Sequence, residues 1–385
     1  MRHMLRALGF WIWGLIAISI AVSVVPLGYR VAALWRLHGI SAPSDPGAPS
    51  GTASTRSPTN TGLQPTTTRA YTPEETQKTN QMVFRLAAGN QDYPTAAAYG
   101  EQLAAAGSAT PGDLAVLAQI TYLQKDCKNS GLWADKAIAA ARKAGDAPKE
   151  NLFQFKLQCA SDAGDNAAMA AVLVDLIKLT NKTKYWNALL RIERQQERDD
   201  HNLLMIYRVM YDTGAMSAGA DYMEMAQLLG DAALPGEAQT VVEKATAAGL
   251  FTDQKDRDRA ARLLNGLKPR AEADRKDAAR LDAEDAKNQA GEFDVKSGEV
   301  YYGSGDYQDA ATAINRGMQK GQVKHLEEAY VYLGRSFLAL RNVADAANAF
   351  EHLKTVPGIS DRVLRLWTLY AESALPPSAP NASAG

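Results

Sequence analysis

A short pattern of residue types occurs twice near the carboxyl end of this 385-residue chain. Four residues between 326 and 359 each have a counterpart of similar character 36 positions earlier. The four pairs are Gly298 and Gly334, Tyr301 and Phe337, Ala310 and Ala346, and Ile314 and Phe350. A unit of this length cannot bury its apolar face alone, so neighbouring units must stack to form a core. The repeat therefore favours a binding scaffold and argues against a catalyst.

The spacing within each copy resembles the tetratricopeptide repeat, a helix–turn–helix unit of about 34 residues. The second copy matches that family at Leu333, Gly334, Phe337, Ala346, Phe350 and Pro357. A third stretch matches it at Met225, Ala226, Leu229, Ala238, Val242 and Ala245. The resemblance implies an all-α solenoid of stacked helix pairs that binds protein. The resemblance is specific near 294–358 and moderate over 220–249. Over 73–215 the sequence matches only the general alternation of paired helices.

The amino terminus carries an uncharged run at residues 9–29, which is long enough to cross a bilayer as a helix. Two arginines precede it, and Trp11, Trp13 and Tyr29 lie toward its ends, as interfacial anchors do. A cleaved signal peptide is the alternative, although the run is long for one and no clear cleavage site follows. Flanking positive charge is nearly balanced. We expect a single-pass anchor in a bacterial inner membrane with a periplasmic body, because that arrangement is common for a first span.

Changes in composition divide the chain into six parts. Residues 1–40 hold the membrane anchor, and 41–72 form a Ser-, Thr- and Pro-rich tether that cannot offset its ordering entropy. Helix pairs follow over 73–250, degenerate before 220, and then a charged helical insertion over 251–290 that Pro269 should break or kink. Residues 291–375 hold the clear repeats and a capping helix, and 376–385 form a disordered tail.

Charge and histidine usage exclude several functional classes. Lys and Arg total 42 against 43 Asp and Glu, and no basic stripe is visible, so we expect no nucleic-acid partner. No metal-binding, phosphate-binding or catalytic motif occurs in a suitable setting. The histidines are scattered at His3, His38, His201, His325 and His352. We therefore expect no catalytic residue, no cofactor and no metal site.

Cys127 and Cys159 are the two cysteines of the chain. Their separation is close to one repeat length, so stacking of adjacent pairs could bring them together. Two unrelated buried thiols are the alternative, since free cysteine is often buried. In an oxidising compartment an even count favours a disulfide.

The family resemblance also indicates a binding surface. In tetratricopeptide arrays the first helix of each pair lines a concave groove. The residues at groove-facing positions are Glu224, Gln227, Lys296, Glu299, Tyr302, Glu328, Tyr332 and Arg335. Mixed charge with two tyrosines would suit an extended peptide, and an ordinary solvated face is the alternative. The residues of the family's carboxylate-clamp subgroup are absent at their positions, which argues against recognition of a chaperone carboxyl terminus.

Together these observations predict a membrane-anchored, non-catalytic scaffold or adaptor that binds a protein partner through its solenoid groove. A self-assembling structural component of the cell envelope is the alternative, and an enzyme subunit is a third. The sequence names neither the partner nor the oligomeric state.

Overall fold

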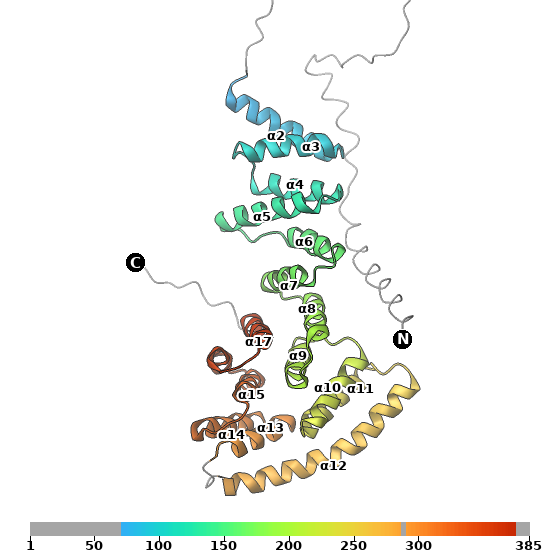
Figure 1. Cartoon of the computed structure of the whole chain (residues 1–385), viewed down its shortest axis with the longest axis vertical. Coiled ribbons are helices and arrows are strands. Elements are labelled where there is room, and N and C mark those ends of the chain that lie inside the picture. Colours follow the sequence, from blue (N-terminus) through green and yellow to red (C-terminus); the bar gives the residue numbers. More distant parts are fainter. Residues whose placement is uncertain (1–70, 286–289, 375–385) are drawn as a thin grey trace, which may run out of the picture. The chain divides into compact units, whose positions relative to one another are not determined.

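The computed structural model describes residues 71–285 and 290–374, and the regular structure of these residues is entirely helical (Figure 1). The predicted all-α class is therefore confirmed for this part of the chain. The predicted anchor, the tail and nearly all of the tether lie outside the described residues. Among the helices that are described, none is both long enough and apolar enough to cross a membrane.

Most helices form antiparallel pairs of neighbours. In chain order the first pairs are α2 (Pro73–Gly89) with α3 (Tyr93–Ala105), α4 (Pro111–Leu123) with α5 (Cys127–Lys143), α6 (Glu150–Asp162) with α7 (Asn166–Thr180), α8 (Thr183–Gln196) with α9 (Asp200–Asp212), and α10 (Gly219–Asp231) with α11 (Pro235–Ala247). The remainder are α12 (Gln254–Asp285), α13 (Glu292–Gly303) with α14 (Tyr307–Lys320), α15 (Leu326–Ala339) with α16 (Val343–His352), a short 3-10 helix (Leu353–Thr355), and α17 (Asp361–Ala374).

The turn inside most pairs is built the same way. One residue adopts a left-handed backbone, and the following residue caps the second helix. The left-handed residues include Gln91 (φ 62°), Lys125 (φ 62°), Gly164 (φ 68°), Ala233 (φ 59°), Gly305 (φ 82°) and Arg341 (φ 59°). In three pairs the next residue is an aspartate whose carboxylate accepts a backbone N–H of the second helix. The cap offsets the cost of about 1–2 kcal/mol that a non-glycine residue pays in this conformation.

The repeated glycines mark the closest approach of the two helices of a pair. A Cβ atom on Gly334 of α15 would lie 2.6 Å from the ring of Phe350 of α16. A Cβ atom on Gly298 of α13 would lie 2.4 Å from the side chain of Ile314 of α14. The glycine in the first helix thus makes room for the large apolar residue in the second, which explains why both positions recur together in the sequence.

Helix α12 replaces a pair with one long element that connects α11 to α13. It continues through Pro269, so of the two expected effects, a break or a kink, the break does not occur. Pro269 and Asn265 are exposed, so the carbonyl that loses its intrahelical hydrogen bond can bond to water instead. The opposite face buries Ala260, Leu267 and Ala278, and α12 packs along both α11 and α13.

The carboxyl-terminal helix does more than cap the last repeat. Helix α17 packs on α16 and also on α7 and α9, far earlier in the chain. Arg362 of α17 pairs with Glu193 at 2.7 Å and with Glu197 at 3.0 Å, both near the end of α8. Trp367 is fully buried and stacks with Phe350, with ring centroids 5.6 Å apart. The chain after α12 therefore returns to the middle of the stack.

A disulfide joins the second pair to the third. Cys127 begins α5 and Cys159 lies in α6, and their Cα atoms are 5.5 Å apart across the bond. The bridge closes a loop of 32 residues, which is worth roughly 3–4 kcal/mol in the chain-entropy model. It fastens one pair to the next at the position that the sequence spacing favoured.

Replacing Gly334 with Ala should lower the free energy of unfolding by about 1–3 kcal/mol, because the new methyl group would overlap the ring of Phe350. That ring is held between Trp367 and Tyr370 and has no space to move away. Gly266→Ala in α12 is the matched control, since no atom lies within 4 Å of its added Cβ. The control should gain about 0.5–1 kcal/mol from helix propensity. Equal effects of the two changes in urea denaturation would contradict the assigned packing.

Candidate functional site

The structure divides the eight predicted groove residues into two groups. Glu224, Gln227 and Lys296 are exposed, and Tyr302 is half-buried. The other four are buried inside the protein: Glu299, Glu328, Tyr332 and Arg335. The expectation that all eight face an open groove is wrong for these four, because they are buried. In front of α15 the space is occupied by side chains from α9 and α11.

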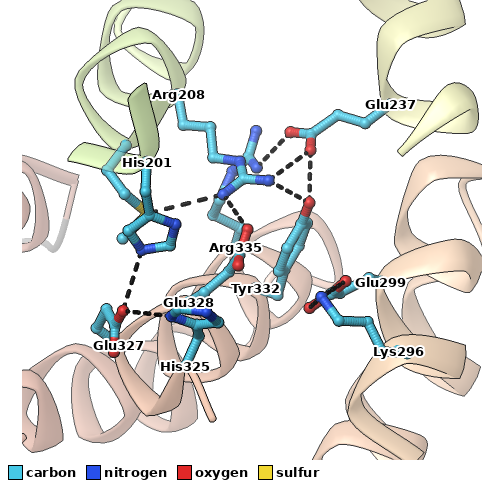
Figure 2. A network of polar contacts seen from close by, with 11 residues as sticks. His201, Arg208, Glu237, Lys296, Glu299, His325, Glu327, Glu328, Tyr332 and Arg335 are labelled. Carbon is cyan, nitrogen blue, oxygen red and sulfur yellow. Dashed lines mark hydrogen bonds and ion pairs between the residues drawn. The ribbon is translucent and has the colours of Figure 1, made fainter. Parts of the chain in front are cut away.

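Arg208 of α9 lies at the centre of this contact and has no exposed surface (Figure 2). Its Nη1 donates to Oε1 of Glu328 at 2.7 Å, and its Nη2 donates to Oε2 of Glu237 at 3.1 Å. The same Nη2 also donates to the hydroxyl of Tyr332. One guanidinium group thus joins α9, α11 and α15.

Arg335 of α15 makes the second half of the network. Its Nε and Nη2 donate to the two carboxylate oxygens of Asp212 at 2.8 and 3.0 Å, a two-point match of fork to carboxylate. Its Nη1 donates to Glu237 at 2.7 Å. Glu237 also accepts from the Tyr332 hydroxyl at 2.6 Å. Burial alone would raise the pKa of Glu237, but Arg208 and Arg335 reverse that effect and lower it to about 2.

Two tyrosine rings cover the guanidinium groups. Arg208 lies 4.5 Å from the ring centroid of Tyr332, and Arg335 lies 4.7 Å from that of Tyr302. The two rings meet edge to face, with centroids 5.1 Å apart. A cation over an aromatic face gains free energy, especially where water is excluded. Burial raises the pKa of both tyrosines well above the usual value, so both hydroxyls stay protonated, and that of Tyr332 donates to Glu237.

Glu299 of α13 is the least compensated charge in this region. Burial raises its pKa to about 7, and repulsion from Glu328 adds to the rise. Lys296, one helical turn earlier, pairs with it at 2.7 Å and opposes the shift. Burial would also raise the pKa of Glu328, but Arg208 outweighs burial there and the net shift is downward.

The network is a structural junction and offers no room for a substrate. The cavity beside Glu237 and Glu299 has a volume of about 10 Å³, which is space for about one water molecule. Strongly shifted pKa values are typical of catalytic sites as well as of structural ion pairs. Here Arg208, Arg335 and Glu237 have their partners in adjoining helices, and Glu299 has its partner, Lys296, in its own helix.

Sequence reasoning missed Arg208, Asp212 and Glu237, which supply the second side of the junction. One signal was available. Arg208 stands within an otherwise apolar run of α9 (204–210), so a helix buried all round would place its charge in the core. A buried guanidinium group requires carboxylate partners. The sequence does not reveal that these partners come from α11 and α15.

No family model matches the chain, and no curated protein matches it. Solved structures that align with it include a tetratricopeptide repeat protein from Parabacteroides merdae, at 11% identity over 76% of this chain and 98% of that one, with a TM-score of 0.27. The TPR2AB domain of yeast Sti1 in complex with pHSP90 aligns at 10% identity over 78% and 99%, with a TM-score of 0.26. A repeat protein from Cytophaga hutchinsonii aligns at 10% over 75% and 98%, with a TM-score of 0.27.

The TM-scores of these alignments are far below 0.5, so they carry no argument about the family of this chain or about what it binds. The interpretation of the fold rests on the chain's own helix pairs, their common turn and the glycines that recur with them.

Arg335→Met should lower the free energy of unfolding by about 3–5 kcal/mol, because it leaves Asp212 and one oxygen of Glu237 buried without a cation. The matched control is Lys78→Met, which removes a cation from an exposed pair with Glu74 in α2. That pair should contribute less than about 1 kcal/mol. A loss in Arg335→Met no larger than in the control, measured by urea denaturation, would show that the junction is dispensable.

Glu299 should make the protein less stable as the pH rises. Its pKa in the folded state, about 7, lies above the unfolded value, so the folded chain binds the extra proton between the two values. The stability that the protonated Glu299 contributes is fully present below about pH 4.5 and is lost as the pH rises through 7. When the pH is raised from 5 to 8, the free energy of unfolding of the Glu299→Gln variant should fall by up to roughly 3 kcal/mol less than that of the wild type.

The control for this pH dependence is Glu351→Gln, which alters an exposed glutamate paired with Lys354 at the same three-residue spacing. Its effect should be the same at pH 5 and pH 8. The raised pKa would be contradicted if the difference in free energy of unfolding between the wild type and Glu299→Gln were the same at pH 5 and pH 8.

Proposed function

We propose that this chain is a non-catalytic scaffold, held at a bacterial membrane by residues 9–29, that binds a protein partner through the first helices of its amino-terminal pairs. The stack of helix pairs supports the scaffold function, and the long uncharged run at the amino terminus supports the anchor. The single observation that carries the binding surface is a row of apolar residues at one repeated position.

That position lies nine residues before the left-handed residue of the turn, in the six pairs whose turn has one. In the first three pairs it is occupied by Met82, Val116 and Phe155. Met82 is 64% exposed and Val116 is 37% exposed, whereas Phe155 is half-buried and stacks on Tyr122 at 4.8 Å. The same position in later pairs holds Glu224, Lys296 and Tyr332, which are charged or buried in the junction. Among these six residues, only those of the amino-terminal pairs are both apolar and at least partly exposed.

Neighbouring residues extend the row along the helices. Leu86 lies one turn after Met82 in α2, and Leu123 lies two turns after Val116 in α4, so each pair of residues shares a helix face. The two helices are linked by Arg85 of α2, which pairs with Asp113 of α4 at 3.1 Å. Exposed apolar patches of this kind on a soluble surface mark interaction sites. We infer that the partner presents an extended or helical segment with apolar side chains at intervals.

A photo-crosslinking residue placed at Met82 or Val116 should capture the partner in living cells. The matched control is Leu132 of α5, an equally apolar residue that is 47% exposed but lies on a second helix. The proposal expects a discrete adduct from the first two positions and none from the third. Adducts of equal yield at all three positions would show general stickiness and would overturn the proposed surface.

The same cells test the anchor separately. The adduct should sediment with membranes, and deletion of residues 1–40 should release the body into the soluble fraction while its crosslinking chemistry stays intact. Recovery of the intact protein as a soluble chain with a new amino terminus beyond residue 29 would replace the anchor with a cleaved signal peptide, and would leave the binding surface unaffected.

A further inference from the structure

Two histidines and a glutamate meet beside the junction, on the side of Arg208 away from Glu237 (Figure 2). His201 lies in the first turn of α9, His325 caps the start of α15, and Glu327 lies in the first turn of α15. Nε2 of His201 is 3.0 Å from Oε1 of Glu327, and Nδ1 of His325 is 3.3 Å from the same oxygen. The two imidazole rings lie with their centroids 4.8 Å apart.

These distances are those of ligands around one small cation. With bonds of about 2.0–2.2 Å to nitrogen and oxygen, two ligand atoms on a tetrahedral zinc ion are about 3.3 Å apart. Two of the three ligand pairs already have this separation, and all three ligand atoms lie within 4.8 Å of one another. His325 is exposed, so rotation of its side chain can close the remaining distance.

We propose that His201, His325 and Glu327 form a binding site for one zinc-class divalent cation, with water as the fourth ligand. Two imidazole nitrogens and one carboxylate suit Zn²⁺, Co²⁺, Ni²⁺ or Cu²⁺. Ca²⁺ and Mg²⁺ take oxygen ligands and are poorly matched. The exposed edge of His325 provides the route by which the cation and its water enter.

The bound cation would fasten the start of α15 to the start of α9. These segments are 126 residues apart in sequence at His201 and Glu327, and they meet at the contact through which the carboxyl-terminal repeats return to the stack. The neighbouring residue Glu328 pairs with Arg208 of α9 in the junction. The cation would therefore add a third type of bond, beside ion pairs and apolar packing, to a closure that the fold already makes.

The alternative is that the three side chains make hydrogen bonds only, without a metal. A titration with Co²⁺, whose visible absorption reports its ligands, separates the two. We expect the full chain, purified without a histidine tag and stripped with a chelator, to bind one Co²⁺ that Zn²⁺ displaces. His201→Ala and His325→Ala should each weaken binding by at least about tenfold, as removal even of supporting groups does at metal sites. Zn²⁺ should raise the thermal midpoint of the wild type but not that of His201→Ala or His325→Ala.

Controls exclude the other histidines. His352→Ala, and a His3→Ala/His38→Ala double variant, should bind Co²⁺ like the wild type. Because His325 is exposed, its alanine variant should fold normally and gives a clean test even if His201→Ala is destabilised. The proposal is overturned if the wild type binds no Co²⁺ above the level of the double variant of His201 and His325, or if His325→Ala binds with unchanged affinity.

Discussion

The arrangement of the second half of this protein depends on the pairing of two buried arginines with acids from other helices. Arg208 and Arg335 share Glu237, and each has a further carboxylate of its own, Glu328 and Asp212. Taking these charges out of water is costly, and the cost is recovered only when all partners are in place. The network therefore admits one arrangement of α9, α11 and α15 and penalises the others. Apolar packing around Trp367 of α17 then completes the contact.

This closure gives the first helices of the stack different surroundings. In α15 the face that carries Tyr332 and Glu328 is buried in the junction, whereas Glu224 of α10 and Lys296 of α13 are exposed. The amino-terminal pairs keep the corresponding face free and occupy it with Met82 and Val116. The disulfide between α5 and α6 stiffens this open half, which has no returning helix of its own between α2 and α6. In the binding function that we propose, rigidity of this surface reduces the entropy lost on binding.

Local features of the fold could be predicted from the sequence, and distant contacts could not. Gly334 and Phe350 pack against each other within one helix pair, so their spacing in the sequence indicated the repeat. The turns could be predicted because glycine and aspartate have local conformational preferences. Pro269 does not break α12, because the hydrogen bond that it removes lies on an exposed face where water can replace it. The burial of Glu328 and Tyr332 could not be predicted, because Arg208, which contacts both, lies over 100 positions before them and is visible in the sequence only as a lone charge in an apolar run.

The long separation between α9 and α15 also bears on how the chain is made. Helix α9 leaves the ribosome about 120 residues before its partners in α15, and during that interval Arg208 and Asp212 can remain hydrated only if their surface stays open. The contacts of Arg208 and Asp212 with α15 therefore form only after α15 has been synthesised. A chain cut short before α15 retains an uncovered pair of charges within an apolar helix. Such a surface distinguishes a chain that lacks α15 from one in which α15 has folded against α9.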